Sequence, residues 1–360
     1  MKKSLIALAV LGAYAGVASA QSSVKLDGTL DVGLQSVKNG SAANGDQQKS
    51  MINNGINSSQ FRVSGIEDLG GGLKAGFNLN SGVFPDTGRS SSENGGKFWN
   101  RRATVSLLGG FGEVRLGRDY TPAFWNETLF DPFGTNGIGT LLSAVGAAGS
   151  NLGTNATTAV RADNSIQYWT PALGGLVVHA MVSANENTAA NSGNKHLGLR
   201  VGYSVGPIDL GVAFGDTKVA PVNGDDKLST VNFAGSYKFG PAKINFQMEQ
   251  FKAAGGTRKE TGTQLGAVIT LGQGEIRAAF NRYDSKGPAT NPAGLRDADD
   301  ATHFALGYVY NLSTRTALYG TYSTLKNKGA ATNTIGGLSA AGMLGGETSS
   351  GIEGGLRHFF

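Results

Sequence analysis

Apolar and polar residues alternate along most of this chain with a period of two. From Val24 to Gln35 the even-numbered residues are apolar or glycine, and the odd-numbered residues are polar apart from Gly33. Such alternation predicts β-strands with one face against an apolar medium and the other against a polar one. The stretch is about eleven residues long, as tilted membrane-crossing strands are, whereas strands of soluble proteins are about half that length.

The same pattern recurs through the whole chain and predicts sixteen strands. The connections between them contain Gly, Pro, Asn and Ser where the chain must reverse tightly, because these residues suit tight turns. The predicted strands cover residues 24–35, 58–67, 73–84, 97–108, 113–119, 161–170, 176–184, 195–205, 208–217, 227–239, 242–252, 261–271, 275–284, 301–310, 314–326 and 349–360.

The fifteen connections fall into two classes that alternate strictly: seven are tight, and eight are longer and polar. Tight turns on one rim and long loops on the other are the layout of an outer-membrane barrel, whose closed sheet has no free edge. Sixteen strands leave room for a water-filled interior. The sequence therefore predicts an all-β fold, a 16-stranded antiparallel transmembrane β-barrel. The alternative is a soluble β-sandwich or a surface adhesin.

Aromatic residues near the ends of predicted strands support the membrane interpretation, because such residues form girdles at the two membrane interfaces. We expect them at Tyr168, Trp169, Tyr308, Tyr310, Tyr319, Tyr322, Phe359 and Phe360.

The segment from Phe111 to Pro171 interrupts this regular plan. It begins and ends with short strands, but about forty residues between them show little strand or helix pattern and are rich in Gly, Ala, Asn and Thr. A loop this long in a compact domain is unusual and tends to be functional or disordered. We expect it to fold into the lumen of the barrel and to narrow it.

The first twenty residues have the pattern of a secretory signal peptide. Lys2 and Lys3 precede an apolar run from Leu5 to about Val17, and Ala18-Ser-Ala20 is an A-x-A cleavage site. The apolar run is shorter than the roughly 20 residues that a membrane helix needs, which disfavours an uncleaved anchor. We therefore expect residues 1–20 to be removed and residues 21–360 to form one barrel domain.

Composition excludes several classes of function. The formal charge is +5 and falls to +3 when Lys2 and Lys3 are removed, and no block of basic residues suggests nucleic-acid binding. The chain has no cysteine, so thiol chemistry and iron–sulfur sites are excluded. The four histidines lack metal-ligand spacing, and no serine is singled out as their partner. We expect no enzyme activity, no cofactor and no metal site, and we interpret the acidic run Asp297–Asp300 as a solvated loop rather than a divalent-cation site.

Seven stretches of the chain together resemble one family, the trimeric general porins of β-proteobacteria, Gram-negative outer-membrane channels. The resemblance covers essentially all of residues 21–360. The stretches are Gln21–Asp31, Gly65–Phe77, Arg101–Leu107, Gly112–Asp119, Asn164–Tyr168, Tyr308–Ser313 and Gly355–Phe360.

The resemblance implies a homotrimer in the Gram-negative outer membrane, with a third extracellular loop, here about Asp119–Val160, folded inward. It implies contact with outer-membrane lipid and lipopolysaccharide, and passage of ions and small hydrophilic solutes. The terminal Phe360 resembles the C-terminal aromatic residue that the barrel-assembly machinery reads as an insertion signal. The family's Pro-Glu-Phe-like turn is replaced here by Asp131-Pro-Phe-Gly134.

Parity and resemblance together suggest a basic wall at the narrowest point of such a channel. Arg62 alternates with the apolar Phe61 and Val63, so it faces water, and Arg161 shares parity with polar residues of its strand. The family places the Arg101-Arg102 pair at this wall, and alternation favours Arg102 without excluding Arg101. Relatives with anion selectivity have a basic residue two positions before Arg62, where this chain has a glutamine.

Acidic residues of the long loop are candidates for the opposite side of the constriction. They are Asp119, Glu127 and Asp131, and no Lys or Arg lies between Asp119 and Arg161. A pore selects by its width and by the charges that line it. The overall balance predicts a weakly anion-selective passive channel. The alternative is a substrate-specific outer-membrane channel, which would need a track of aromatic residues or extra arginines in the lumen.

Overall fold

The computed structural model describes residues 23–40, 47–91, 96–141, 160–184, 195–222, 225–253, 259–287, 297–335 and 343–360, with the side chains of 219–226 excepted. The expected signal peptide, residues 1–20, lies outside the described residues. Within the described ranges, no helix is long and apolar enough to cross a membrane.

The described residues contain eighteen strands and one helix. The helix, α2, spans Pro122–Phe130. The strands are β1 Ser23–Asn39, β2 Gln47–Ile52, β3 Gln60–Gly70, β4 Leu73–Phe84, β5 Arg89–Ser90, β6 Arg102–Gly109, β7 Gly112–Tyr120, β8 Arg161–Trp169, β9 Leu176–Ser183, β10 His196–Val205, β11 Ile208–Val222, β12 Asp225–Phe239, β13 Ala242–Ala253, β14 Lys259–Leu271, β15 Gly274–Lys286, β16 Ala301–Asn311, β17 Thr316–Asn327 and β18 Thr348–Phe359.

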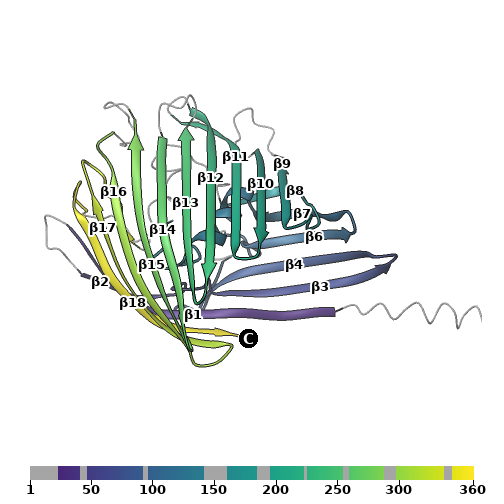
Figure 1. The fold of residues 1–360 in the computed structure, drawn as a ribbon, viewed down its shortest axis with the longest axis horizontal. Coiled ribbons are helices and arrows are strands. Elements are labelled where there is room, and N and C mark those ends of the chain that lie inside the picture. Colours follow the sequence, from purple (N-terminus) through teal and green to yellow (C-terminus); the bar gives the residue numbers. More distant parts are fainter. Residues whose placement is uncertain are drawn as a thin grey trace, which may run out of the picture.

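Sixteen of these strands form one closed antiparallel ring, as predicted. Each strand pairs with the next along the chain, and β18 pairs with β1 over eleven residues, from Thr29–Phe359 to Asn39–Ser349. The other two strands are additions: β2 pairs with β1 above the end of β3, and β5 is a two-residue strand beside β4. Figure 1 shows the strands side by side around a curved wall. Because the ring closes, each barrel strand has a hydrogen-bonding neighbour on both sides.

Tight turns join alternate pairs of strands on one rim. The turns after β10, β12 and β14 contain Gly206, Gly240 and Gly272, each in the left-handed region with φ between 54° and 60°. That conformation strains residues with a side chain, which explains the glycines. In Figure 1 the β10–β11 and β12–β13 turns lie at the lower ends of their strands.

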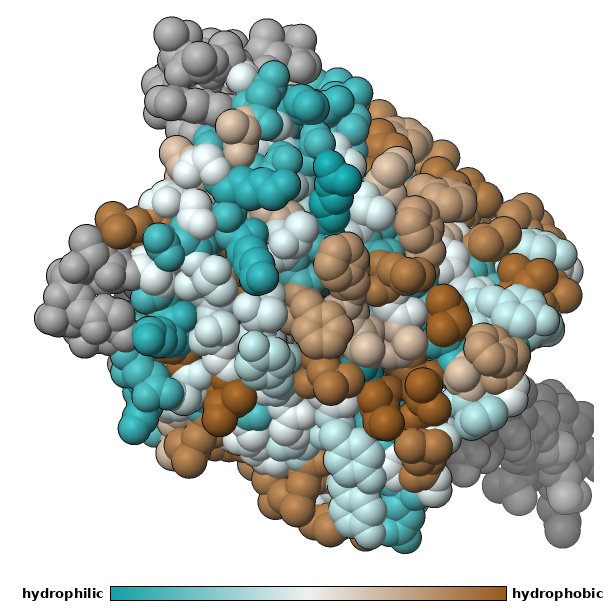
Figure 2. All heavy atoms as spheres, turned by 60° about the vertical axis from the view of Figure 1, so that its left-hand side comes forward, coloured by the Kyte–Doolittle hydropathy of each residue, from teal (hydrophilic) through white to brown (hydrophobic). Residues whose placement is uncertain are grey.

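The two faces of the wall have the opposite chemistry expected in a membrane. Outward residues such as Leu265, Phe280 and Leu306 are apolar and exposed, whereas inward residues such as Gln264 and Asn281 are polar and buried. Figure 2 shows one outer face, where apolar side chains gather toward the right and lower parts and hydrophilic ones toward the top and left. This alternation places hydrocarbon outside and polar groups inside.

The structure differs from the predicted elements in four places. The short strand β2 lies in a stretch predicted as a loop, before the second predicted strand, which is β3. β6 starts five residues later than expected, and β11 and β12 extend to Val222 and from Asp225 through most of a predicted loop. Two expected girdle residues instead point inward: Trp169 stacks on His179, and Tyr319 is buried. Both residues occupy regular inward positions of their strands, in step with Gln167 and Thr321.

The break between β2 and β3 is organised by Asp31. Its fully buried carboxylate accepts hydrogen bonds from the backbone N–H groups of Gly55, Ile56 and Asn57 at 3.2, 2.9 and 2.7 Å. It also accepts one from the Tyr319 hydroxyl at 2.6 Å. The segment between β2 and β3 therefore turns inward and wraps its amides around one acid.

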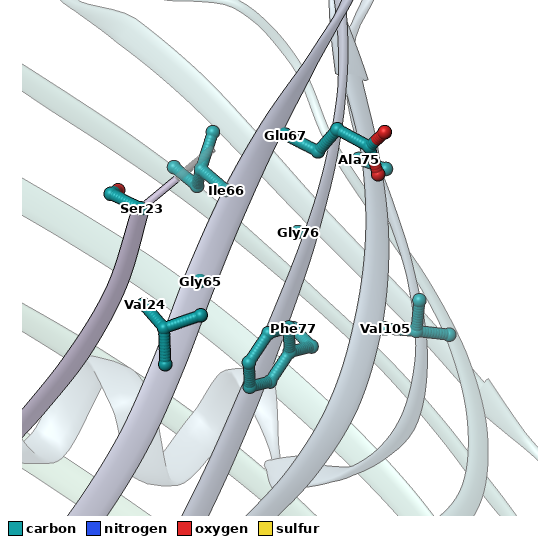
Figure 3. Close-up of a pocket in the computed structure, with 9 residues that line it drawn as sticks. All are labelled: Ser23, Val24, Gly65, Ile66, Glu67, Ala75, Gly76, Phe77 and Val105. Atoms are coloured by element: carbon teal, nitrogen blue, oxygen red, sulfur yellow. The ribbon is translucent and has the colours of Figure 1, made fainter. Parts of the chain in front are cut away.

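A shallow hollow marks the outer face of β1, β3, β4 and β6. It has a volume of about 310 Å³ and lies over Gly65 and Gly76, between the side chains of Val24, Phe77 and Val105. Figure 3 shows these apolar side chains around the two glycines. The outer surface is thus not uniformly smooth in this quarter of the barrel.

Candidate functional site

The first half of the long loop is a helix held against the inner wall. Thr121 is the N-cap of α2, with its hydroxyl accepting from Phe124 N at 3.3 Å, and Pro122 occupies the first helical position. Both residues favour a helix start. The Asn126 side chain accepts from Arg200 Nε at 2.8 Å and donates to Asn232 at 2.6 Å. The helix therefore lies inside the barrel, bonded to polar residues of β10 and β12.

The loop continues across the interior toward β18. Asn245 donates to the Phe130 carbonyl at 2.8 Å, and Tyr283 donates to the Leu141 carbonyl at 2.9 Å. Ile138 N donates to Glu353 Oε1 at 3.2 Å. These contacts attach residues 126–141 to inward side chains from β10 to β18, so the described half of the loop narrows the lumen.

Four inward glycines form the surface on which the loop lies. A side chain at Gly198, Gly211, Gly266 or Gly307 would meet Pro122, Asn126, Pro132 or Phe133 of the loop, respectively. We call these four residues the glycine bed. The sequence shows them only as glycines at inward-facing positions of separate strands, a signal that can be read only once the loop's path is known.

Two of the predicted wall arginines are ion-paired. Arg62 bonds Asp27 with an N–O distance of 2.7 Å, and Lys25 shares the same carboxylate at 3.1 Å. Arg102 contacts Asp119 at 2.8 Å. Arg62 and Arg102 both face the interior as parity predicted, but a carboxylate balances part of their charge.

The other two arginines meet at one tyrosine. Arg161 donates to the Tyr120 hydroxyl at 2.9 Å, and its Cζ lies 4.4 Å from the centre of the Tyr120 ring. Arg101 donates to the same hydroxyl at 3.2 Å and to Gln60 at 3.0 Å. Within the described residues, neither guanidinium has a carboxylate partner. The two arginines that the sequence could not separate thus differ in their partners: Arg102 is paired with a carboxylate, whereas Arg101 has none among the described residues.

Arg161 reaches this position by a route that alternation does not predict. The β7–β8 pairing shifts register between Gly117 and Asp119, and Asn164 adopts a φ of 52°. After this shift, Ala162 is fully buried and lies opposite Asp119, and Arg161 lies opposite Tyr120. Such a bulge changes the direction of the side chains beyond it.

The three predicted loop acids do not form an exposed acidic face. Asp119, at 2% exposure, lies on the wall and contacts Arg102 and Arg115 at 2.8 and 2.5 Å. Asp131 is buried and accepts from Thr140, from the amides of Phe133 and Thr135, and from Gln264. It therefore shapes the loop's bend.

The third loop acid, Glu127, is buried against the barrel wall at 1% exposure, facing Glu249 of β13. Burial, together with the nearby Glu249 and Asp131 carboxyls, raises the pKa of Glu127 well above its usual 4.5. Burial also raises the pKa of Asp131, although its hydrogen bonds oppose the rise. Burial therefore disfavours the charged form of Glu127, which weakens the negative side of the predicted constriction.

The raised pKa of Glu127 predicts a pH-dependent loop attachment. An acid whose pKa is raised by folding stabilises the docked loop fully below its ordinary pKa of 4.5, and this contribution is lost as pH rises toward the raised value. We expect brief current interruptions in single-channel recordings to become more frequent from pH 4.5 to pH 8. Glu127→Gln should weaken this trend, while the exposed Glu67→Gln should keep it. An unchanged trend in Glu127→Gln would contradict the assignment.

The C-terminal residue is part of the closing strand pair. Phe360 N donates to the Gly28 carbonyl at 3.1 Å, and Gly28 N donates to the Phe360 carbonyl at 3.2 Å. The Phe360 ring lies over the space where a Gly28 side chain would stand. Phe360 thus has a structural place in the barrel seam, in addition to its expected role as an insertion signal.

One serine and one histidine do form a hydrogen-bonded pair inside the barrel. His303 Nε2 lies 2.6 Å from Ser323 Oγ and 3.1 Å from the Ile138 carbonyl, and its Nδ1 lies 2.8 Å from Asn281. His303, Ser323 and Asn281 are all fully buried beneath the loop. No substrate can reach the serine there, so the three side chains support the loop. Among the described residues, no group of His, Asp and Glu could hold a metal ion.

A closed barrel with a lipid-facing apolar exterior, a polar interior and a loop folded inside defines an outer-membrane channel. A sequence profile described as Gram-negative porin matches residues 7–330. The chain belongs to this Gram-negative porin family. It lies in the outer membrane and forms a channel for passive diffusion of ions and small hydrophilic solutes, as predicted, and not an enzyme.

Two curated relatives and two solved structures illustrate the similarity. Outer membrane porin protein 32 of Delftia acidovorans is 38% identical, with 100% of both chains covered. An outer membrane porin protein of Bordetella pertussis is 29% identical, covering 91% of this chain and 95% of its own. The anion-selective porin from Comamonas acidovorans superposes with a TM-score of 0.82 at 35% identity, over 94% of this chain and 100% of its own. OmpT of Vibrio cholerae shares the fold at a TM-score of 0.66 and 14% identity, over 95% of this chain and 99% of its own.

Proposed function

We propose that the constriction of this porin prefers anions, and more strongly than the overall charge of the chain suggests. The observation that carries the proposal is the imbalance of charge on and around β1, β3 and β6–β8. Among the described residues, the ion pairs and hydrogen bonds of this wall involve eight basic side chains and four carboxylates, while Lys38, Asp31, Glu67 and Asp68 of β1 and β3 lie outside these ion pairs. The basic residues are Lys25, Arg62, Lys97, Arg101, Arg102, Arg115, Arg118 and Arg161, and the acids are Asp27, Glu113, Asp119 and Asp163.

The burial of the loop acids supports the same preference. Glu127 and Asp131 are both buried against the opposite wall, and burial raises the pKa of Glu127 well above its usual range, so neither presents an exposed carboxylate to the opening. Arginine carries its positive charge on a planar guanidinium that suits the binding of anions, and Arg101 and Arg161 both present this group beside Tyr120. The solved relative titled an anion-selective porin agrees with this sign of selectivity.

The test is the reversal potential of the native protein in a planar bilayer under a KCl gradient. We expect a potential of the sign that chloride permeation produces, and conductance steps that close in threes if the channel is a trimer. A potential of the opposite sign would overturn the anion preference, and would assign the dominant charge to the carboxylates of the constriction.

We further propose that the protein assembles as a homotrimer. The sequence resemblance supports this assembly. The apolar hollow over Gly65 and Gly76 supports a contact on this face, because it lies on the outside of adjacent strands and can receive a side chain of another subunit. The rest of the apolar outer face contacts outer-membrane lipid, with lipopolysaccharide on the side of the long loops.

The processing of the chain is proposed on sequence grounds. We infer that residues 1–20 direct export and are removed, and that residues 21–360 form the mature porin domain. The barrel-assembly machinery then recognises the terminal strand ending at Phe360. The exposed ring of Phe360, at 44%, supports this recognition.

A further inference from the structure

Three aromatic side chains follow one another inside the barrel, beside the basic wall. The Trp125 ring of α2 lies 6.1 Å from the Tyr120 ring and 5.6 Å from the Trp169 ring, measured between ring centres. Trp169 in turn stacks on His179 at 3.6 Å. Tyr120, Trp125 and Trp169 are all partly exposed, and we call them the aromatic row.

The row extends along the channel. Tyr120 pairs with Arg161 at one end of the β7–β8 ladder, and Trp169 pairs with Glu113 at the other end. The β7 residues at the two ends are seven positions apart. Because neighbouring ring centres are 6.1 and 5.6 Å apart, the two outer rings of the row lie no more than about 12 Å from each other. A solute that passes this wall therefore meets aromatic faces over a short part of its path, beside the arginines.

An arginine lies on a ring at each end of the row. Arg161 Cζ lies 4.4 Å from the centre of the Tyr120 ring, and Arg115 Cζ lies 5.4 Å from that of the Trp169 ring. Arg161 has no carboxylate partner among the described residues, whereas Arg115 pairs with Glu113 and Asp119. Positive charge and aromatic surface thus alternate on one wall, and the uncompensated charge lies at the Tyr120 end.

We propose that the aromatic row makes this channel favour planar aromatic carboxylates over aliphatic carboxylates of the same charge and similar size. This proposal rests on the anion preference proposed above and names a solute class within it. The carboxylate meets Arg161 and Arg101, while the ring stacks against Tyr120, Trp125 or Trp169. Guanidinium groups bind carboxylates in a planar geometry, and aromatic rings pair by offset stacking or edge-to-face contact.

The test compares benzoate with cyclohexanecarboxylate, which carries the same charge on a ring of six carbons without aromatic faces. Permeability ratios come from bi-ionic potentials of the native trimer in planar bilayers, with sodium as the common cation. We expect benzoate to be favoured about two- to tenfold, the range of one aromatic pair. We also expect benzoate to reduce the chloride current at lower concentration than cyclohexanecarboxylate does. Equal permeabilities and equal block in the native channel would overturn the proposal.

Two variants at one position separate stacking from simple sieving. Trp125→Phe keeps an aromatic face in a smaller side chain, so stacking should preserve most of the preference. Trp125→Leu removes the face and should abolish it. If Phe and Leu reduce the preference equally, the row acts only by its bulk. Phe304→Leu, on the lipid-facing side of β16, is the matched control and should behave as the native protein.

The chloride-to-potassium permeability ratio keeps the two proposals distinct. We expect this ratio to stay the same in Trp125→Leu, which also shows that the loop is still in place. A native channel that prefers chloride but does not distinguish the two carboxylates refutes the aromatic row alone. A native channel that prefers potassium refutes the anion preference, whatever the carboxylates do.

Discussion

Replacing both Arg101 and Arg161 with glutamine should remove most of the chloride preference of the channel. Glutamine removes the positive charge and, because it is shorter, also gives up the bond that each terminal guanidinium nitrogen donates to the Tyr120 hydroxyl. A unit charge about 4 Å from an ion contributes about 1 kcal/mol in water, which is roughly fivefold in permeability for each arginine. The measurement is the chloride-to-potassium permeability ratio in about 0.01 M KCl, where screening extends to about 30 Å.

The controls for this experiment use charges in other settings. Arg315→Gln makes the same change of charge in an exposed turn and should leave the ratio unchanged. Arg102→Gln should have a smaller effect than either unpaired arginine, because Asp119 keeps Arg115 as its partner. A ratio that falls with Arg102→Gln but not with the double variant would mean that the paired arginine controls selectivity.

Asp31→Ala should be the most destabilising single substitution proposed here. It removes the acceptor of four hydrogen bonds and leaves the amides of Gly55, Ile56 and Asn57 without a partner in a buried place. Bonds to charged groups contribute about 1.5–3 kcal/mol each, so we expect a loss of about 4 kcal/mol or more in the free energy of unfolding. The measurement is the urea unfolding midpoint in detergent, followed by tryptophan fluorescence.

A milder variant keeps this prediction testable if Asp31→Ala does not fold. Tyr319→Phe removes one of the four bonds and should cost about 1–3 kcal/mol. The exposed Asp86→Ala is the matched control and should keep the native midpoint. Stability equal to the control in both test variants would show that Asp31 does not hold the inward turn.

Parity reasoning worked wherever the strands stay regular. It predicted the sixteen barrel strands, the inward direction of Arg62 and the polar interior from the alternation alone. It could not predict the local geometry at Arg161, because a bulge beside Asn164 shifts the β7–β8 register, and single-residue register shifts leave no clear mark in the sequence. It also overestimated β6 and shortened β11 and β12, where strands end by pairing rather than by a change in pattern.

The loop was harder to predict for a different reason. No helix was expected in the loop, and α2 has no polar stripe to mark it, because most of its residues are buried. The environment of Glu127 depends on Glu249, more than a hundred residues later in the chain, so its neutral form could not be inferred locally. The overall charge of the chain therefore suggested only a weak anion preference, whereas the positions of the basic and acidic side chains around the constriction support a stronger one.

The glycine bed implies that the width of the channel can be changed by substitutions in the barrel wall on which the loop lies. The loop residues Asn126 and Pro132 occupy the positions that side chains of Gly211 and Gly266 would take. The loop can lie this close to the wall only because both wall residues are glycine. Any larger residue at these positions would move the loop toward the opening without altering one atom that touches the solute. A related porin could therefore acquire a narrower channel by single substitutions of these glycines, while its arginines and the pairing of β1 with β18 stay unchanged.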